Sequence, residues 1–181
     1  MLKASQVQNV SLIGLPGSGK STVGRQLARR LQFPFFDSDH VIEERLGCSI
    51  RVAFTRDGEE SFRNLEESVL DELTQSPRAV VSTGGGAVLR QVTRQRLRER
   101  GHVVYLNSSP DDIARRLKHD TSRPLLQVDD PLTRLRELYA ARDPLYRETA
   151  HFTLETGRPS AATLVNMIVM QLELAGAQPL N

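Results

Sequence analysis

One short motif near the start of the chain constrains the fold more than any other feature. Residues 10–13 form an apolar run typical of a buried strand, and the sequence GLPGSGKS follows directly at residues 14–21. It matches the pattern G-x-x-x-x-G-K-[ST], a glycine-rich turn between a strand and a helix whose backbone N–H groups converge on phosphate oxygens. The motif predicts a nucleoside triphosphate site, but it does not specify the reaction.

Each residue type in this motif has a mechanical reason. We expect the lysine to reach the β and γ phosphates and the following serine hydroxyl to ligate Mg²⁺, while the glycines let the backbone approach the phosphates. The residues expected to bind the nucleotide phosphates are Gly17, Ser18, Gly19, Lys20, Ser21 and Thr22.

Strand-like and helix-like segments alternate along the rest of the chain. Short apolar runs bounded by turn residues predict five strands, at residues 10–13, 33–36, 79–81, 103–106 and 151–154. Apolar residues at helical spacing lie between them, and Ser109-Pro110 is typical of a helix start. The alternation predicts a three-layer α/β/α fold with a five-stranded parallel sheet.

Composition narrows the class of protein. The 181 residues are 39% hydrophobic and 25% charged, which predicts one globular domain over residues 1–181. A net charge of +2 favours a small anionic ligand over nucleic acid. The single cysteine, Cys48, excludes an internal disulfide, and no apolar run approaches 18 residues. We therefore expect a cytoplasmic, soluble protein with no membrane partner.

The basic residues are unevenly distributed, with 21 arginines and 3 lysines. Arginine suits bidentate recognition of carboxylates and phosphates, although a GC-rich genome would produce the same bias. One block is interrupted by Glu99 and lacks aromatic residues, so a solvated helix face is a better interpretation than a nucleic-acid site. This block contains Arg90, Arg94, Arg96, Arg98 and Arg100. The four histidines are too widely spaced to predict a zinc site.

Two further segments are candidates for the phosphate acceptor site. Phe36-Asp37-Ser38-Asp39 ends the second predicted strand, and Asp39 could accept a hydroxyl proton or cap a helix over residues 41–46. No acidic residue ends the third strand, so Asp37 is the nearest candidate to serve Mg²⁺ through water. The glycines of Thr83-Gly84-Gly85-Gly86 indicate either close approach of a ligand or a tight turn.

Taken together, the motifs resemble those of the shikimate kinase family over essentially the whole chain. They are GLPGSGKST at residues 14–22, FDSD at 36–39, FR at 62–63, TGGGA at 83–87, RPLL at 123–126 and RDPLY at 142–146. The resemblance implies a P-loop fold like that of nucleoside monophosphate kinases, with a substrate-binding insert at about 38–66 and a lid at about 118–130. It also implies transfer of the γ-phosphoryl group of ATP to the 3-hydroxyl of shikimate, a step toward chorismate and the aromatic amino acids.

The resemblance assigns the substrate to Asp39, Arg63, the glycines Gly84, Gly85 and Gly86, and Arg142. The two arginines would hold the shikimate carboxylate, Asp39 would orient the 3-hydroxyl and accept its proton, and the glycines would offer backbone N–H groups. No covalent phosphoenzyme is required.

The resemblance also implies residues around ATP. Arg123 in the lid would stabilise transition-state charge together with Lys20, and Arg116 and Arg158 would flank adenine, although Arg115 could take the place of Arg116. Mg²⁺ is the only metal expected, and the protein is expected to be a monomer. Two alternatives remain open, a gluconate-type small-acid kinase and a regulatory P-loop switch; the switch gives no reason for Arg63 and Arg142 to accompany Asp39.

Overall fold

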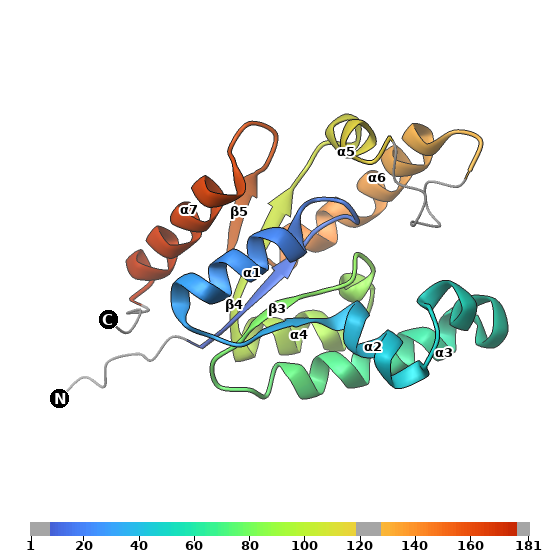
Figure 1. Cartoon of the computed structure of the whole chain (residues 1–181), viewed down its shortest axis with the longest axis horizontal. Coiled ribbons are helices and arrows are strands. Elements are labelled where there is room, and N and C mark those ends of the chain that lie inside the picture. Colours follow the sequence, from blue (N-terminus) through green and yellow to red (C-terminus); the bar gives the residue numbers. More distant parts are fainter. Residues whose placement is uncertain (1–7, 119–127, 177–181) are drawn as a thin grey trace.

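The computed structural model describes residues 8–118 and 128–176, and its centre is a parallel sheet (Figure 1). Within the described residues, the sheet has five strands in the order β2-β3-β1-β4-β5, and every neighbouring pair is parallel. The strands are β1 (Asn9–Ile13), β2 (Phe35–Asp37), β3 (Val80–Ser82), β4 (Gly101–Asn107) and β5 (Phe152–Glu155). The predicted α/β fold with five parallel strands is confirmed, and every strand end lies within two residues of its expected position.

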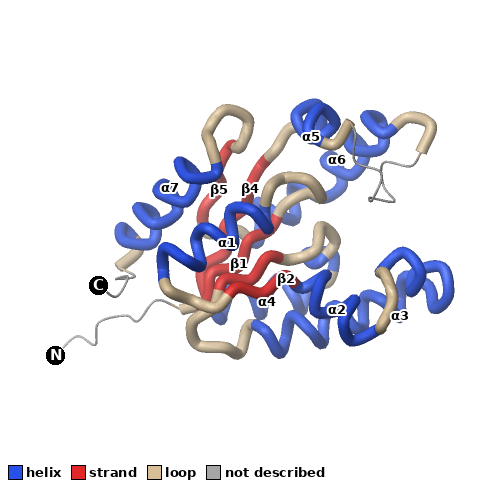
Figure 2. Tube along the Cα trace, in the orientation of Figure 1, coloured by secondary structure: helices blue, strands red, loops and turns tan. Residues whose placement is uncertain are grey.

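Helices cover both faces of the sheet (Figure 2). One face carries α1 (Lys20–Leu31) and α7 (Ala161–Leu174), which pack against each other. The opposite face and the sheet ends carry α2 (Ser38–Leu46), α3 (Ile50–Leu73), the 3₁₀ helix η1 (Ala87–Leu89), α4 (Gln91–Arg100), α5 (Pro110–Arg116) and α6 (Pro131–Thr149). The molecule therefore has the three layers that the sequence pattern predicts.

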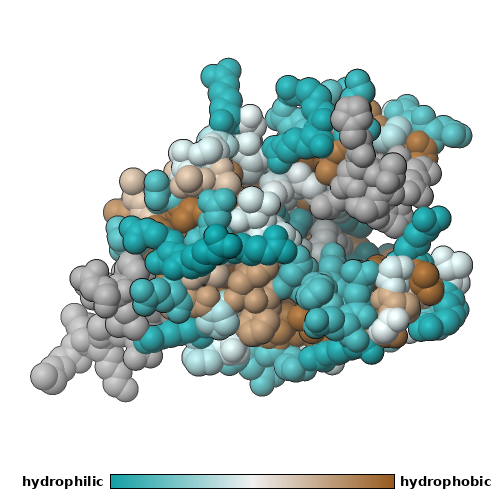
Figure 3. All heavy atoms as spheres, in the orientation of Figure 1, coloured by the Kyte–Doolittle hydropathy of each residue, from teal (hydrophilic) through white to brown (hydrophobic). Residues whose placement is uncertain are grey.

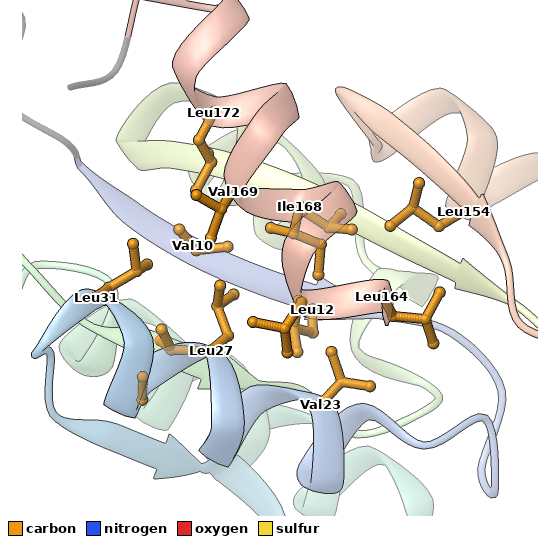
Figure 4. Close-up of a cluster of buried hydrophobic side chains, with 14 of the residues drawn as sticks. Val10, Leu12, Val23, Leu27, Leu31, Leu154, Leu164, Ile168, Val169 and Leu172 are labelled. Carbon is orange, nitrogen blue, oxygen red and sulfur yellow. The ribbon is translucent and has the colours of Figure 1, made fainter. Parts of the chain in front are cut away.

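Strand β4 shows why the core has two sides. Val104 and Leu106 join the cluster beneath α1 and α7, while Val103 and Tyr105 join the cluster beneath α4 and α6. Successive side chains of a strand point to opposite faces, so a strand covered on both sides must be apolar throughout. Figure 4 shows the first of these clusters, with strand side chains meeting those of the two helices.

Helix ends follow their sequence signals. The Ser109 hydroxyl accepts the Asp112 N–H at 3.1 Å and Pro110 lies in the first turn of α5, as expected. Within α3, Gly58 has φ 84° and ψ 170°, a conformation essentially restricted to glycine, and it divides the helix in two. The predicted insert at 38–66 thus covers α2 and part of α3; that it is a distinct substrate-binding unit stays a prediction.

The arginine block on α4 differs from expectation. Arg90 pairs with Glu67 at 2.9 Å, Arg100 pairs with Asp71 at 2.7 Å, and Arg98 donates to backbone carbonyls of residues 148–150. These side chains join α4 to α3 and α6, so the prediction of a merely solvated helix face is wrong. The forked guanidinium explains this use of arginine, because one side chain can reach several acceptors.

Polar and charged side chains dominate the face shown in Figure 3, with small apolar patches between them. Among the residues that the structure describes, no helix has the combination of length and hydropathy needed to cross a membrane.

Candidate active site

Three segments of the site meet where neighbouring strands end. The phosphate loop (residues 14–21) follows β1, Asp37 ends β2, and the glycine triplet 84–86 comes shortly after β3. Because these strands are adjacent and parallel, their carboxyl ends lie at one edge of the sheet, where open α/β folds bind ligands. Figure 1 shows this edge between α5 and α6 on one side and α2 and α3 on the other.

The phosphate loop takes a conformation that its glycines permit. Gly17 and Gly19 have φ values of 84° and 92°, which residues with a Cβ rarely adopt. No side chain caps α1, so the first N–H groups of this helix are left for an anion. The buried Lys20 ammonium donates to the carbonyls of Gly14 at 2.8 Å and Leu15 at 2.9 Å, which holds it over the loop.

Oxygen ligands gather beside the start of α1. The Ser21 hydroxyl donates to Asp37 Oδ2 at 2.6 Å and lies 3.5 Å from the Ser82 hydroxyl. Within the described part of the chain, no group of three or more His, Cys, Asp or Glu residues could hold a metal. A divalent ion here would complete its coordination with oxygens that the protein does not supply, such as those of water or phosphate.

Asp37 also fixes the start of the next helix. Its Oδ1 accepts the backbone N–H groups of Asp39 at 3.1 Å and His40 at 3.4 Å, so Asp37 is the N-cap of α2. The helix begins at Ser38, and the alternative that Asp39 caps a helix over residues 41–46 is wrong. Because the Asp37 side chain caps the helix, the Asp39 side chain is available to the site.

The Asp39 carboxyl group lies in a crowded, negatively charged place. A Cβ on Gly84 would lie 2.7 Å from its Oδ1, so the carboxylate lies directly against the glycine backbone. Burial raises the pKa of Asp39 to about 6, the charges of Glu66 and Asp37 add to the rise, and Lys20 opposes it. A carboxyl group with such a pKa can both release and accept a proton near neutral pH.

Glu66 is a site residue that the sequence interpretation did not identify. It is 3% exposed and pairs with Arg63, with 2.6 Å between Oε1 and the guanidinium. Burial raises the pKa of Glu66, and Arg63 opposes the rise. The available signal was its position, since Glu66 shares a helical face with Phe62, Val69 and Leu73 and is charged where that face is otherwise apolar.

The glycine triplet forms the turn from β3 into η1, which confirms the second of the two alternatives proposed from the sequence, while close approach of a ligand stays a prediction. None of the three has a positive φ, although they form a turn in which the Ala87 N–H donates to the Gly84 carbonyl at 3.1 Å. A Cβ on Gly85 would lie 2.6 Å from Pro16, and one on Gly86 would overlap the Arg63 guanidinium. The site's own side chains need the space, so the triplet lets them reach the main chain.

Helix α6 contributes the remaining acceptor-side residue. Arg142 is half-buried, and its Nη1 would lie 3.3 Å from a Cβ on Gly85. Asp39, Arg63, the glycine triplet 84–86 and Arg142 are thus brought together from four separate elements or loops, as the sequence interpretation anticipates.

A cavity of about 420 Å³ lies on the other side of the phosphate loop. It is lined by Ser18, Gly19, Thr22, Val23, Asp112, Arg115, Arg116, Thr156, Gly157, Pro159, Ala161 and Leu164. Arg116 spans the cavity wall, donating to the Gly17 carbonyl at 3.2 Å and the Thr156 hydroxyl at 3.2 Å, whereas Arg115 pairs with Asp112. Arg158 lies between two lining residues but is exposed and not itself part of the lining. Of the predicted lid, residues 119–127, including Arg123, lie outside the described residues.

Comparison with known proteins agrees with this geometry. The family model for shikimate kinase matches residues 16–173. A shikimate kinase of Paracidovorax citrulli is 62% identical over 174 residues, covering 94% of this chain and 95% of the relative. One of Ralstonia nicotianae is 58% identical over 170 residues, covering 94% and 90%. Among solved structures, shikimate kinase from Acinetobacter baumannii in complex with shikimate has a TM-score of 0.88 at 46% identity, covering 93% of this chain and 94% of that one.

Proposed function

The chain belongs to the shikimate kinase family and is an ATP-dependent phosphotransferase, and from that premise we propose how its residues transfer the γ-phosphoryl group of ATP to the 3-hydroxyl of shikimate. The products are 3-phosphoshikimate and ADP. The observation that supports this most is the meeting of Asp39 with Arg63 and Arg142 around the glycine triplet, beside a phosphate loop. An acceptor that carries both hydroxyl and carboxylate groups needs a carboxylate side chain to accept a hydroxyl proton and arginine side chains to bind its own carboxylate.

Asp39 orients the acceptor hydroxyl and takes its proton. As the shikimate oxygen bonds to the γ-phosphorus, the bond to the ADP oxygen breaks and the hydroxyl proton passes to an Asp39 oxygen. Burial beside Glu66 and Asp37 raises the pKa of Asp39 to about 6, which makes it a stronger base than an exposed carboxylate yet ionised at neutral pH.

Arg63 and Arg142 hold the shikimate carboxylate. The Arg63 Nε is buried and makes no hydrogen bond to the described residues, although it lies 3.5 Å from the largely exposed Glu59 carboxylate as a loose ion pair. A substrate carboxylate would satisfy this donor by a charge-assisted hydrogen bond. Glu66 holds the other side of the same guanidinium and fixes its plane.

The residues beside α1 fit Mg²⁺ brought by ATP. Ser21 would ligate the ion through its oxygen while still donating its hydrogen to Asp37, and Asp37, with both oxygens already engaged, would act through water. Their all-oxygen character suits this metal. Bound there, the ion would neutralise charge on the β and γ phosphates.

The cavity beside the phosphate loop would take the nucleoside. Lys20 would turn from the loop carbonyls to the β and γ phosphates, and residues 17–22 would supply backbone N–H groups. Arg116, already in the cavity wall, is better placed to stack on adenine than Arg115, which pairs with Asp112. Arg158 would close the outer side, and Arg123 with the lid at 118–130 would cover the phosphates and exclude water.

A coupled assay of ADP release with ATP, Mg²⁺ and a panel of hydroxy acids tests this function. We expect release that depends on shikimate and is absent with gluconate. Release with gluconate alone would support the small-acid alternative; the likeness to a gluconokinase from Sinorhizobium meliloti, at 19% identity and a TM-score of 0.55, concerns the fold alone. Slow hydrolysis unaffected by any acid would support a nucleotide switch.

A further inference from the structure

Gly85 is held from three directions. A Cβ at this position would lie 2.6 Å from Pro16 of the phosphate loop and 3.3 Å from Arg142 of α6. In addition, the Tyr146 hydroxyl donates to the Gly85 carbonyl at 2.6 Å. The peptide backbone proposed to receive shikimate is thus fixed between the loop that binds the phosphate donor and the helix that supplies an arginine.

Tyr146 is placed to do this by the geometry of α6. It lies one helical turn after Arg142, so both side chains extend from the same face of the helix toward Gly85. The residue is fully buried, and its ring packs against Tyr105 with 4.9 Å between centroids. A buried hydroxyl requires hydrogen-bond partners, and this one donates to the Gly85 carbonyl and is also hydrogen-bonded by the Arg142 side chain.

We propose that Tyr146 is a positioning residue for shikimate, acting through its hydrogen bond to the Gly85 carbonyl. That carbonyl shares a planar trans peptide with the Gly86 N–H, so fixing one end fixes the direction of the other. The same plane sets the position of the Gly86 Cα, against which the Arg63 guanidinium packs. The inference rests on the proposed function of the glycine triplet and the two arginines in binding the acceptor.

Tyr105 offers a matched control. Its hydroxyl is also buried and also reaches α6, with two acceptors for its one hydrogen, Asp143 Oδ1 at 2.8 Å and Asn107 Oδ1 at 3.0 Å. Replacing either tyrosine by phenylalanine removes one buried hydroxyl and keeps the paired rings. Only the Tyr146 change releases Gly85 and Arg142, so the two variants separate positioning of the acceptor-binding groups from general attachment of α6.

Steady-state kinetics and thermal unfolding of wild type, Tyr146→Phe and Tyr105→Phe test the inference. For Tyr146→Phe we expect the shikimate KM to rise about tenfold, the change in affinity that corresponds to roughly one hydrogen bond. The ATP KM should stay within about twofold, because the phosphate loop keeps its own hydrogen bonds. Tyr105→Phe should lower the unfolding temperature but leave the shikimate KM within about twofold.

A wild-type shikimate KM in Tyr146→Phe, or an equal rise in both variants, would overturn the inference. Partial unfolding cannot imitate the expected result, because a smaller folded fraction lowers the apparent kcat and leaves KM unchanged. Failure of the proposed function is distinguishable: wild type would then show no shikimate-dependent ADP release, or Arg142→Lys would bind shikimate as well as wild type does.

Discussion

Charged side chains are arranged in opposite ways at the two edges of the sheet, the amino edge where the parallel strands begin and the carboxyl edge where they end. At the amino edge, Arg100 binds Asp71 near the end of α3, and Arg98 binds the last carbonyls of α6. At the carboxyl edge, the buried Asp39 and Glu66 carboxyls lie near each other, and burial raises the pKa of both. The first arrangement stabilises the fold, whereas the second keeps groups in an unfavourable charged state that the reaction can use.

Replacing Asp39 by Asn should give the largest effect and the clearest contrast between the edges. Turnover with shikimate should fall by about 10²- to 10⁴-fold because the proton acceptor is lost. Stability at pH 7.5 should rise, on the order of 1 to 3 kcal/mol, since a carboxylate whose folded pKa exceeds its unfolded value destabilises the folded state when ionised. Kinetics and unfolding curves measure both, and the stability gain should vanish below about pH 4, where the wild-type carboxyl is protonated in both states.

Asp71→Asn is the matched change at the amino edge. Arg100 holds the pKa of Asp71 below its usual value, so this carboxylate stabilises the fold at neutral pH and the contribution is lost as pH falls through its lowered pKa. The variant should be less stable than wild type with unchanged turnover. If both variants behaved alike, the contrast between the two edges would be wrong.

Replacing Arg63 by Ala should chiefly raise the shikimate KM, by about 10- to 100-fold, because it removes a charged contact made in both ground and transition states. Arg94→Ala is the control, since the Arg94 Nε is likewise buried without a hydrogen bond among the described residues and lies 3.5 Å from Glu148. Arg94 binds the Val88 carbonyl instead of facing the acceptor site, so its loss should lower stability and spare KM. Steady-state kinetics with shikimate varied would show an unchanged KM in Arg63→Ala if the assignment is wrong.

Much of the fold and of the candidate site was predictable from the sequence, and the exceptions have physical causes. The phosphate loop and the strands follow from local patterns, because each depends on residues close together in the chain. Glu66 was missed since its significance depends on Arg63 and Asp39 being close in space. The α4 arginines were misread because their acceptors lie on α3 and α6, far away in sequence.

The pH dependence of kcat/KM for shikimate should show the effect of the neighbouring carboxylates on the pKa of Asp39. We expect an acidic limb near pH 6, where Asp39 loses its ability to accept a proton. Glu66→Gln should move the limb to lower pH, because removing a neighbouring negative charge lowers the pKa of Asp39. Glu60→Gln, a change on the exposed side of the same helix, should leave the limb in place. A limb at the same pH in wild type and Glu66→Gln would show that the two carboxyl groups are not coupled.

The smallest expected effect lies at the amino edge, where a histidine is held neutral. The His151 Nδ1 accepts the Val103 N–H at 3.0 Å, and burial together with the charges of Arg98 and His102 lowers the pKa of His151. Because its folded pKa lies below the unfolded value of about 6.5, this contribution to stability is present above that pH and is lost as pH falls through the folded pKa.

His151→Gln should therefore lose less stability than wild type when the pH is lowered from 7 to 5. We expect the difference in unfolding temperature between the two proteins to change by no more than about 4 °C over this range. His102 faces the same ring and its pKa is also lowered by burial, so His102→Gln serves as the companion variant. If the unfolding temperatures of all three proteins changed equally with pH, neither histidine would contribute to the pH dependence of stability. That dependence would then come from the carboxylates alone.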